Sequence, residues 1–421
     1  MQNDPGIGRE VKRGTSRFQT YLFASFLGNL VAPIFSLFLP VLAVDIGATV
    51  FEVGLIGGAE NIVYAFMPFV VGHFTDRGKS RQFFILSGFG LLVCVSAFYS
   101  LASSPVALIV ARLLEGLGWA IVWPAIESSI TVDTAGNSGR ALSLFNTSWS
   151  LGAALGPLVG GIVIVFGSSR LVYLATAFAL FVALAANFYS ITKHKDEIPD
   201  LARGQRHSLI EAAKKIFQRH DAKKNFQVRL YVASLILSYA TVGVLYTFFG
   251  PYAKALGMSA LLFSLPVVLF GLIRLFIFVL CTRGSFRSKL LDPAKRNAIV
   301  FLSLLLTCSS PLLILVRDPS GGIYFLAFGL FAVGLAIVYF VCQVGMIAET
   351  NETQMGASAG IFESVIGIGS ATGPIIAGAI SAGSLTSAFL VPFAGFAIVM
   401  LFFGIDAKRL QQRETIPHHL R

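Results

Sequence analysis

Charged side chains inside long apolar stretches are the residues of this sequence best suited to chemistry. Glu60, Glu363 and Arg274 each interrupt such a stretch, and Arg112 and Glu115 stand three residues apart within another. On a helix that spacing places Arg112 and Glu115 one turn apart, where they can pair. A charge at membrane depth usually faces a partner or a water-filled path, and a carboxylate in a low dielectric can exchange protons near neutral pH. We therefore expect these five residues to take part in proton transfer, with Glu60 as the first candidate carrier and Glu363 as the second.

Each of these residues also has a purely structural interpretation. Arg112 and Glu115 could form a self-contained ion pair. A buried glutamate could pair with Arg274 across the two halves of the chain, or Glu363 could lie at the cytoplasmic mouth and simply be solvated. The sequence leaves these alternatives open.

The apolar stretches that hold these charges are long enough to cross a bilayer. Hydrophobic residues make up 55% of the 421 residues and charged residues 13%, against roughly 25% charged residues in soluble domains. A spanning helix needs about 20 mainly apolar residues. An all-α membrane protein with twelve transmembrane helices is therefore predicted. The twelve stretches are 18–44, 50–73, 82–101, 105–130, 140–166, 170–192, 228–253, 258–282, 297–316, 321–347, 358–382 and 384–405.

The polar segments between these stretches predict the domains and the topology. A long polar linker, 193–229, separates a six-helix bundle at 1–192 from a second at 230–405, which a tail at 406–421 follows. With a cytoplasmic N-terminus, nearly all of the 32 lysines and arginines lie on the cytoplasmic side, as the positive-inside rule requires. Both termini are then cytoplasmic in a multi-pass protein of the cell membrane. The net charge of +11 is explained by this topology and by anionic lipid, so no nucleic-acid partner is expected.

The two halves repeat each other in sequence. The stretch "GAALGPLVGG" at 152–161 has a similar segment 217 residues later, "GSATGPIIAG" at 369–378. Likewise, "AIVW" at 120–123 is similar to "AIVY" at 336–339. Duplicated bundles of this kind place a substrate path at their interface near the bilayer midplane. Glycines four residues apart make a groove in which another helix can pack, and a proline permits a bend. The residues assigned to this conformational role are Gly152, Gly156, Pro157, Gly160, Gly369, Gly373 and Pro374.

Three motifs resemble signatures of the major facilitator superfamily. The segment "GHFTDRGKSR" after the second stretch resembles the cytoplasmic loop signature of that family, with Gly72, Asp76 and Arg77 at its characteristic positions. It departs from the pattern because Gly78 directly follows Arg77, and the matching segment of the second half, "TRGSFRSK", lacks the acidic residue. The resemblance implies the family's twelve-helix fold and its alternating-access transport.

The other two motifs indicate a branch of the family. "RLLEGLG" at 112–118 resembles the intramembrane arginine motif, which in proton-coupled members is linked to proton transfer. "GAALGPLVGG" is similar to the antiporter signature, which is associated with drug:proton exchangers. The resemblance covers nearly the whole chain and implies a multidrug efflux transporter.

Polar and aromatic residues on the predicted helices are candidates to line a substrate cavity. Trp119 and Trp123 share a helix face with Arg112 and suit an apolar or cationic ligand, although they could equally be tryptophans of the lipid interface. The remaining candidates are Asn29, Tyr64, Asn146, Tyr239, Tyr246, Tyr339 and Gln343.

The function that these features predict is secondary transport of small solutes, as proton-coupled efflux of amphipathic compounds. The alternatives are proton-coupled uptake of a sugar, an organic acid or another nutrient, and a non-transporting receptor or lipid scramblase. No phosphate-binding loop and no His/Cys metal cluster is evident in the sequence, so we expect no enzyme activity, no cofactor and no metal. The expected partners are a small-molecule substrate, protons and the lipid bilayer, and we expect a monomer.

Overall fold

The computed structural model describes residues 5–75, 81–133, 138–193, 222–348, 355–381 and 383–415, and within these ranges every regular element is helical. The first half contains α1 (Pro5–Asp45), α2 (Val50–Thr75), α3 (Arg81–Leu101), α4 (Pro105–Asp133), α5 (Ser138–Phe166) and α6 (Leu171–Lys193). The second half contains α8 (Ala222–Ala255), α9 (Ala260–Cys281), α10 (Gly284–Leu290), α11 (Arg296–Ser309), η1 (Ser310–Leu315), α12 (Gly322–Ala348), α13 (Met355–Ile380), η3 (Ser387–Leu390) and α14 (Val391–Thr415).

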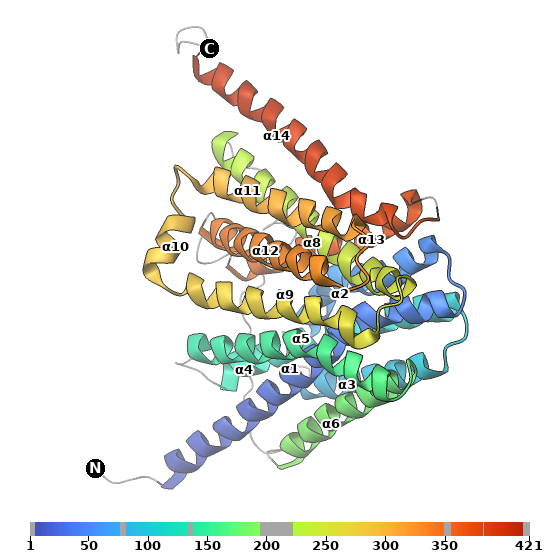
Figure 1. Ribbon diagram of the computed structural model, residues 1–421. Coiled ribbons are helices and arrows are strands. Elements are labelled where there is room, and N and C mark those ends of the chain that lie inside the picture. Colours follow the sequence, from blue (N-terminus) through green and yellow to red (C-terminus); the bar gives the residue numbers. More distant parts are fainter. Residues whose placement is uncertain are drawn as a thin grey trace.

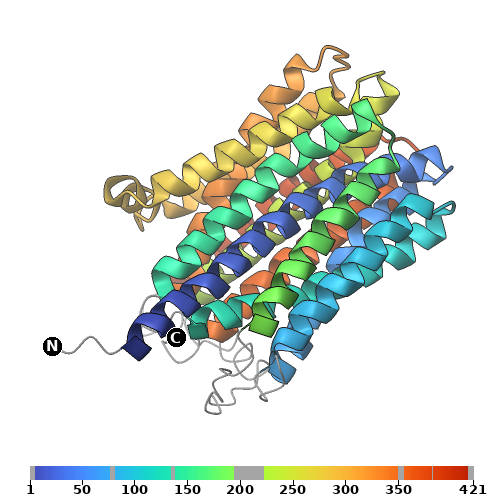
Figure 2. The same ribbon diagram turned by 90° about the horizontal axis from the view of Figure 1, so that it is seen from below.

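The helices match the predicted membrane spans. In the described part of the chain, 11 helical segments are long and apolar enough to cross a membrane, and a shorter apolar stretch, Ser387–Phe403, lies in η3 and α14. The long helices run side by side along one common direction (Figure 2). The predicted all-helical, multi-pass membrane fold is confirmed, and twelve crossings fit these helices.

One predicted helix is shorter than expected. The stretch 297–316 forms α11 only as far as Ser309 and continues as the 3₁₀ helix η1. Pro311 lies at the start of η1 and has no N–H to donate, and its ring clashes with the carbonyl four residues earlier in an α-helix. The α-helix therefore ends ahead of this proline.

The two halves form two bundles of helices (Figure 1), and the helices of each bundle make the same internal contacts. In the first bundle α1 packs on α5 and α6, α2 on α4, and α3 on α4 and α6. In the second, α8 packs on α13 and α14, α9 on α12, and α11 on α12 and α14. Each contact of the first bundle thus has its counterpart in the second. Helix α8 begins at Ala222, within the predicted linker, and residues 194–221 lie outside the described ranges; the domain boundaries stay predictions.

The bundles meet along two equivalent helix pairs, α2 with α13 and α5 with α9, and also where α8 packs on α1 and α2. A Cβ added to Gly54 of α2 would lie 3.0 Å from Cα of Gly378 on α13, and one added to Gly271 of α9 would lie 2.7 Å from Cα of Ala154 on α5. Gly54 and Gly271 are separated by the offset of the sequence repeat. Backbones approach this closely only where a side chain is absent, so the repeat specifies the interface as well as each bundle.

An ion pair closes one end of this interface. Lys254 Nζ, at the end of α8, lies 2.5 Å and 2.6 Å from the two carboxylate oxygens of Asp45 at the end of α1. Both helices reach this end with their C-terminal turns, so it is opposite the end at which α1 begins. The bundles are therefore joined at the end away from the start of α1.

Candidate functional site

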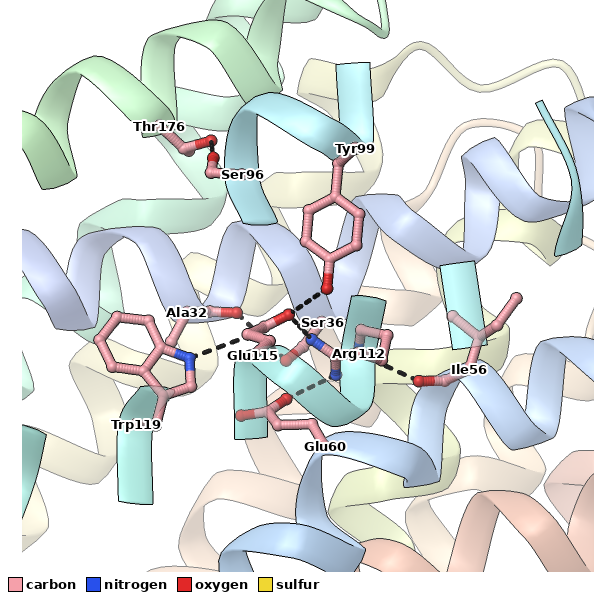
Figure 3. Close-up of polar contacts among 10 residues, drawn as sticks. All are labelled: Ala32, Ser36, Ile56, Glu60, Ser96, Tyr99, Arg112, Glu115, Trp119 and Thr176. Carbon is pink, nitrogen blue, oxygen red and sulfur yellow. Dashed lines mark hydrogen bonds and ion pairs between the residues drawn. The ribbon is translucent and has the colours of Figure 1, made fainter. Parts of the chain in front are cut away.

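Arg112 is the centre of a buried polar cluster between α2, α3 and α4 (Figure 3). Its side chain is 2% exposed; Nη2 lies 2.6 Å from Glu60 Oε2, and Nη1 lies 2.7 Å from Glu115 Oε2. Its Nε donates to the backbone carbonyl of Ile56 at 3.1 Å. The pair expected from the spacing of Arg112 and Glu115 is formed, and Glu60 from another helix joins it. We call Glu60, Tyr99, Arg112, Glu115 and Trp119 the Arg112 cluster.

The two carboxylates of the cluster have different surroundings. Glu115 is fully buried and also accepts hydrogen bonds from Tyr99 Oη at 2.7 Å and from Trp119 Nε1 at 3.1 Å. Glu60 has Arg112 as its ion-pair partner and is 14% exposed. One guanidinium cannot neutralise two carboxylates, so a fully ionised cluster carries one excess negative charge, which is costly at membrane depth. Glu60, being less hydrogen-bonded and more accessible, is the carboxylate suited to take up a proton.

A glycine allows the cluster to assemble. A Cβ added to Gly116 of α4 would lie 3.0 Å from the carbonyl carbon and 3.1 Å from Cα of Glu60, closer than ordinary van der Waals contact. The backbones of α2 and α4 therefore touch at the position of the cluster. This close approach brings the Glu60 carboxylate to Arg112, one turn away on α4.

The predicted tryptophan face is also present. Trp119 and Trp123 stack with ring centroids 5.3 Å apart and planes 3° from parallel. Gly28 of α1 leaves room for them, because a Cβ there would lie 2.8 Å from Trp123 Cη2. Trp119 is buried and bonded to Glu115, so it belongs to the Arg112 cluster rather than to a lipid interface.

A second group of side chains lies where α13 meets the first bundle. Glu363 of α13 is exposed, and it is close enough to Glu127 of α4 and to Tyr64 of α2 to interact with them electrostatically. The next residue, Ser364, donates to the carbonyl of Ala65 on α2 at 3.3 Å. Glu363 and Glu127 therefore lie within electrostatic range of one another, one in each bundle, and both keep solvent-accessible surface.

Arg274 of α9 lies over aromatic rings instead of pairing with a carboxylate. Its guanidinium carbon is 4.9 Å from the ring centroid of Trp149 on α5, 5.7 Å from that of Phe270 and 5.8 Å from that of Phe278. No carboxylate of the described residues lies within ion-pair distance of it. The alternative in which a buried glutamate pairs with Arg274 is therefore wrong for this structure. The contact with Trp149 joins the two bundles.

Tyrosines of the second bundle surround these charges. The rings of Tyr239 and Tyr339 are 6.3 Å apart, and Tyr339 also lies 5.5 Å from Phe278. Gln343 donates weakly to Tyr339 Oη at 3.5 Å, and Tyr246 packs edge-on against Phe270 at 6.2 Å. Three of the predicted cavity residues thus gather beside Glu363 and Arg274, and Tyr246 lies beside Phe270.

Two other predicted cavity residues have different surroundings. Asn29 is buried and donates to the Ser25 carbonyl of its own helix at 3.0 Å, so its side chain is occupied within α1. Asn146 is exposed on α5.

The glycine motifs pack as closely as their spacing predicts. Gly152 and Gly156 leave no room for a Cβ against the backbone of α1 near Leu30, and Gly369 and Gly373 do the same on α8. Gly160 faces the ring of Phe38, and Pro157 and Pro374 lie inside α5 and α13. Of the loop motif, Gly72 lies in α2, while Asp76 and Arg77 lie outside the described residues.

The sequence interpretation missed Glu127 and Trp149. Glu127 carries a signal that could have revealed it, because it continues the four-residue spacing of Glu115, Trp119 and Trp123 along α4. Trp149 has no such signal. Its contact with Arg274 depends on how α5 and α9 are rotated against each other.

Two similar bundles of helices long enough to span a membrane make up the fold. The family model for the Major Facilitator Superfamily matches residues 21–310. The chain belongs to this superfamily.

Known proteins similar to the chain are transporters. The proton-coupled antiporter flippase LtaA of Staphylococcus epidermidis is 23% identical over 80% of each chain, and multidrug resistance protein 2 of Bacillus subtilis is 25% identical over 53% of each. Three MFS-type relatives with 28–32% identity are matched over only 29–36% of their own length. Among solved structures, the nucleoside transporter NupG superposes with a TM-score of 0.74 at 12% identity, covering 94% of this chain and 99% of that one. At this identity the likeness shows the fold alone.

Proposed function

We propose that the protein is a proton-coupled antiporter that exports amphipathic compounds, in the drug:proton branch of its superfamily. The observation that carries the proposal is the Arg112 cluster, in which one buried guanidinium serves two carboxylates. A proton on Glu60 would remove the excess charge, and its release would restore it. The cluster can therefore exist in two charge states within one packed bundle.

Helix α2 connects this charge to the bundle interface. Glu60 projects from the α2 turn that touches α4, while Gly54 and Gly58 of the same helix lie against α13. A change in the Glu60–Arg112 pair therefore acts on a helix that both bundles share. A proton that binds one arrangement of α2 and α13 better than the other shifts the population between them, as alternating access requires.

The direction of transport is supported by relatives and by topology. Two relatives bear names of a proton-coupled antiporter flippase and a multidrug resistance protein, and we extend that activity to this chain. With both termini cytoplasmic, the end closed by Lys254 and Asp45 is the outer one. The structure then corresponds to an inward-facing state, in which Glu127 and Glu363 are open to the cytoplasm. We propose that the protein works as a monomer in the cell membrane.

Proteoliposomes with an imposed pH gradient test this function. The purified protein is tested with ethidium, a nucleoside and a sugar, and proton-driven ethidium movement against the direction of proton flow is expected. The Glu60→Gln variant should fold and lose the dependence on the gradient. Glu52→Gln is the matched control, because Glu52 lies on the same helix, is partly exposed, and bonds through its carboxylate to Thr49 at the start of that helix. Full pH-driven flux by Glu60→Gln would refute the mechanism. Movement of the sugar or the nucleoside in the same direction as the protons would show that the protein works in uptake and not in export.

A further inference from the structure

An arginine without an acidic partner lies at the contact between the two bundles. The Arg274 guanidinium is covered by the rings of Trp149, Phe270 and Phe278, and no described carboxylate reaches it. Cation–π contacts compensate only part of the cost of a cation at membrane depth. The site is therefore suited to an anionic group brought by another molecule.

A carboxylate without a cationic partner lies in the same region. Glu363 is exposed, and in the described part of the chain it has neither a hydrogen bond nor an ion pair. The second carboxylate nearby, Glu127, adds negative potential from the other bundle. This position is suited to a cationic group.

Two tyrosines lie near both charges. Tyr239 and Tyr339 each interact electrostatically with both Arg274 and Glu363, and their rings pack 6.3 Å apart. Tyr339 continues to Phe278, which lies beneath Arg274. An aromatic surface thus leads from the negative position to the positive one without the two charges forming an ion pair.

We propose that Glu363 and Arg274 are the two poles of a binding site for amphipathic zwitterions, whose apolar body lies along Tyr239 and Tyr339. The inference rests on the proposed export function and names its substrate class. A ligand that carries only a cation would leave Arg274 without a counter-charge, and a ligand that carries only an anion would leave Glu363 without one. A zwitterion satisfies both poles, and because its net charge is zero it adds none to the site.

Matched dyes test this site in proteoliposomes. Rhodamine B carries a carboxylate and a cationic ring system, while its ethyl ester keeps the cation and lacks the carboxylate. The wild-type protein should show a transport KM for rhodamine B at least about tenfold lower than for the ester, equal to about 1.4 kcal/mol. Arg274→Gln should abolish that preference by raising the KM for rhodamine B alone. Arg274→Lys should keep part of it, and Glu363→Gln should raise the KM for both dyes.

The control is Arg317→Gln, which removes an exposed arginine ahead of α12 and should leave both KM values unchanged. If Arg274→Gln does not fold, the Lys variant and Glu363→Gln still test the two poles separately. Equal KM values for the two dyes in the wild type would overturn the zwitterion site, and so would an unchanged preference of Arg274→Gln for rhodamine B over its ester. In either case, pH-driven transport of one of the dyes would still uphold the export function. Loss of all pH-driven dye movement in the wild type would overturn both.

Discussion

Replacing Gly116 by alanine should separate Glu60 from Arg112 without touching either charge. The new Cβ would lie 3.0–3.1 Å from the carbonyl carbon and Cα of Glu60, where ordinary contact begins at 3.4 Å. The new Cβ would also collide with the carbonyl oxygen of Glu60, and because all of these atoms are backbone and cannot rotate away, α2 must move away from α4 to make room. That shift lengthens the 2.6 Å contact between Glu60 and Arg112.

The cost follows from two opposed effects. Overpacking of a well-filled contact typically costs about 1–3 kcal/mol. Alanine in a helix interior is favoured over glycine by roughly 0.5–1 kcal/mol. The net expectation is a destabilisation of about 1–2 kcal/mol, together with weakened proton coupling.

The assay compares Gly116→Ala with Gly90→Ala. A Cβ at Gly90 of α3 meets nothing within 4 Å, so that variant should be neutral or slightly stabilised. Thermal unfolding in detergent gives the stability ranking, and dye transport in proteoliposomes at two pH gradients gives the coupling. The close approach of α2 and α4 does not position the cluster if Gly116→Ala has the melting temperature and the proton coupling of the wild type. The same conclusion follows if Gly90→Ala loses as much stability and coupling as Gly116→Ala.

Three further outcomes are expected. Glu115→Gln should lower stability by roughly 1–3 kcal/mol, because a neutral amide replaces the carboxylate that accepts hydrogen bonds from Tyr99, Arg112 and Trp119 while Arg112 keeps Glu60 as its counter-charge; a wild-type melting temperature in detergent would contradict this. Asp45→Asn removes the exposed ion pair with Lys254, which is worth up to about 1 kcal/mol. The outward-facing population should therefore rise by up to about fivefold, as read from spin-label distances between the ends of α1 and α8. A distribution of these distances identical to that of the wild type would exclude a gating role for the ion pair. Hydrogen bonds from the side chain of Ser320 and from backbone N–H groups hold the pKa of Asp318 below its usual range. These bonds should stabilise the loop before α12 at any pH above the usual pKa of an aspartate, and this stabilisation should be lost as the pH falls through the lowered pKa. An Asp318 carboxylate that titrates in NMR like a free aspartate would show that these bonds are absent in solution.

The sequence alone determines the features of this protein that depend on near neighbours. The twelve apolar stretches follow from composition, the Arg112–Glu115 pair follows from a spacing of three residues, and the repeat between the halves is visible by comparing the two halves directly. They are predictable because a bilayer requires each span to satisfy its own backbone hydrogen bonds within a helix, and because residues three apart on a helix are neighbours whatever surrounds it. Local chemistry also explains why α11 ends early, since the proline that follows it is visible in the sequence.

Only the tertiary structure decided which distant charges meet. Glu60 reaches Arg112 because Gly116 lets α2 and α4 touch, whereas Glu363 and Arg274, both ionisable and both in the second bundle, form no ion pair, and Arg274 lies over aromatic rings instead. The sequence could not distinguish these outcomes, since a small rotation of a helix about its axis changes which side chains face its neighbour. The rotation of each helix about its axis and its depth in the membrane depend on packing contacts along its whole length, so no short segment of the sequence determines them.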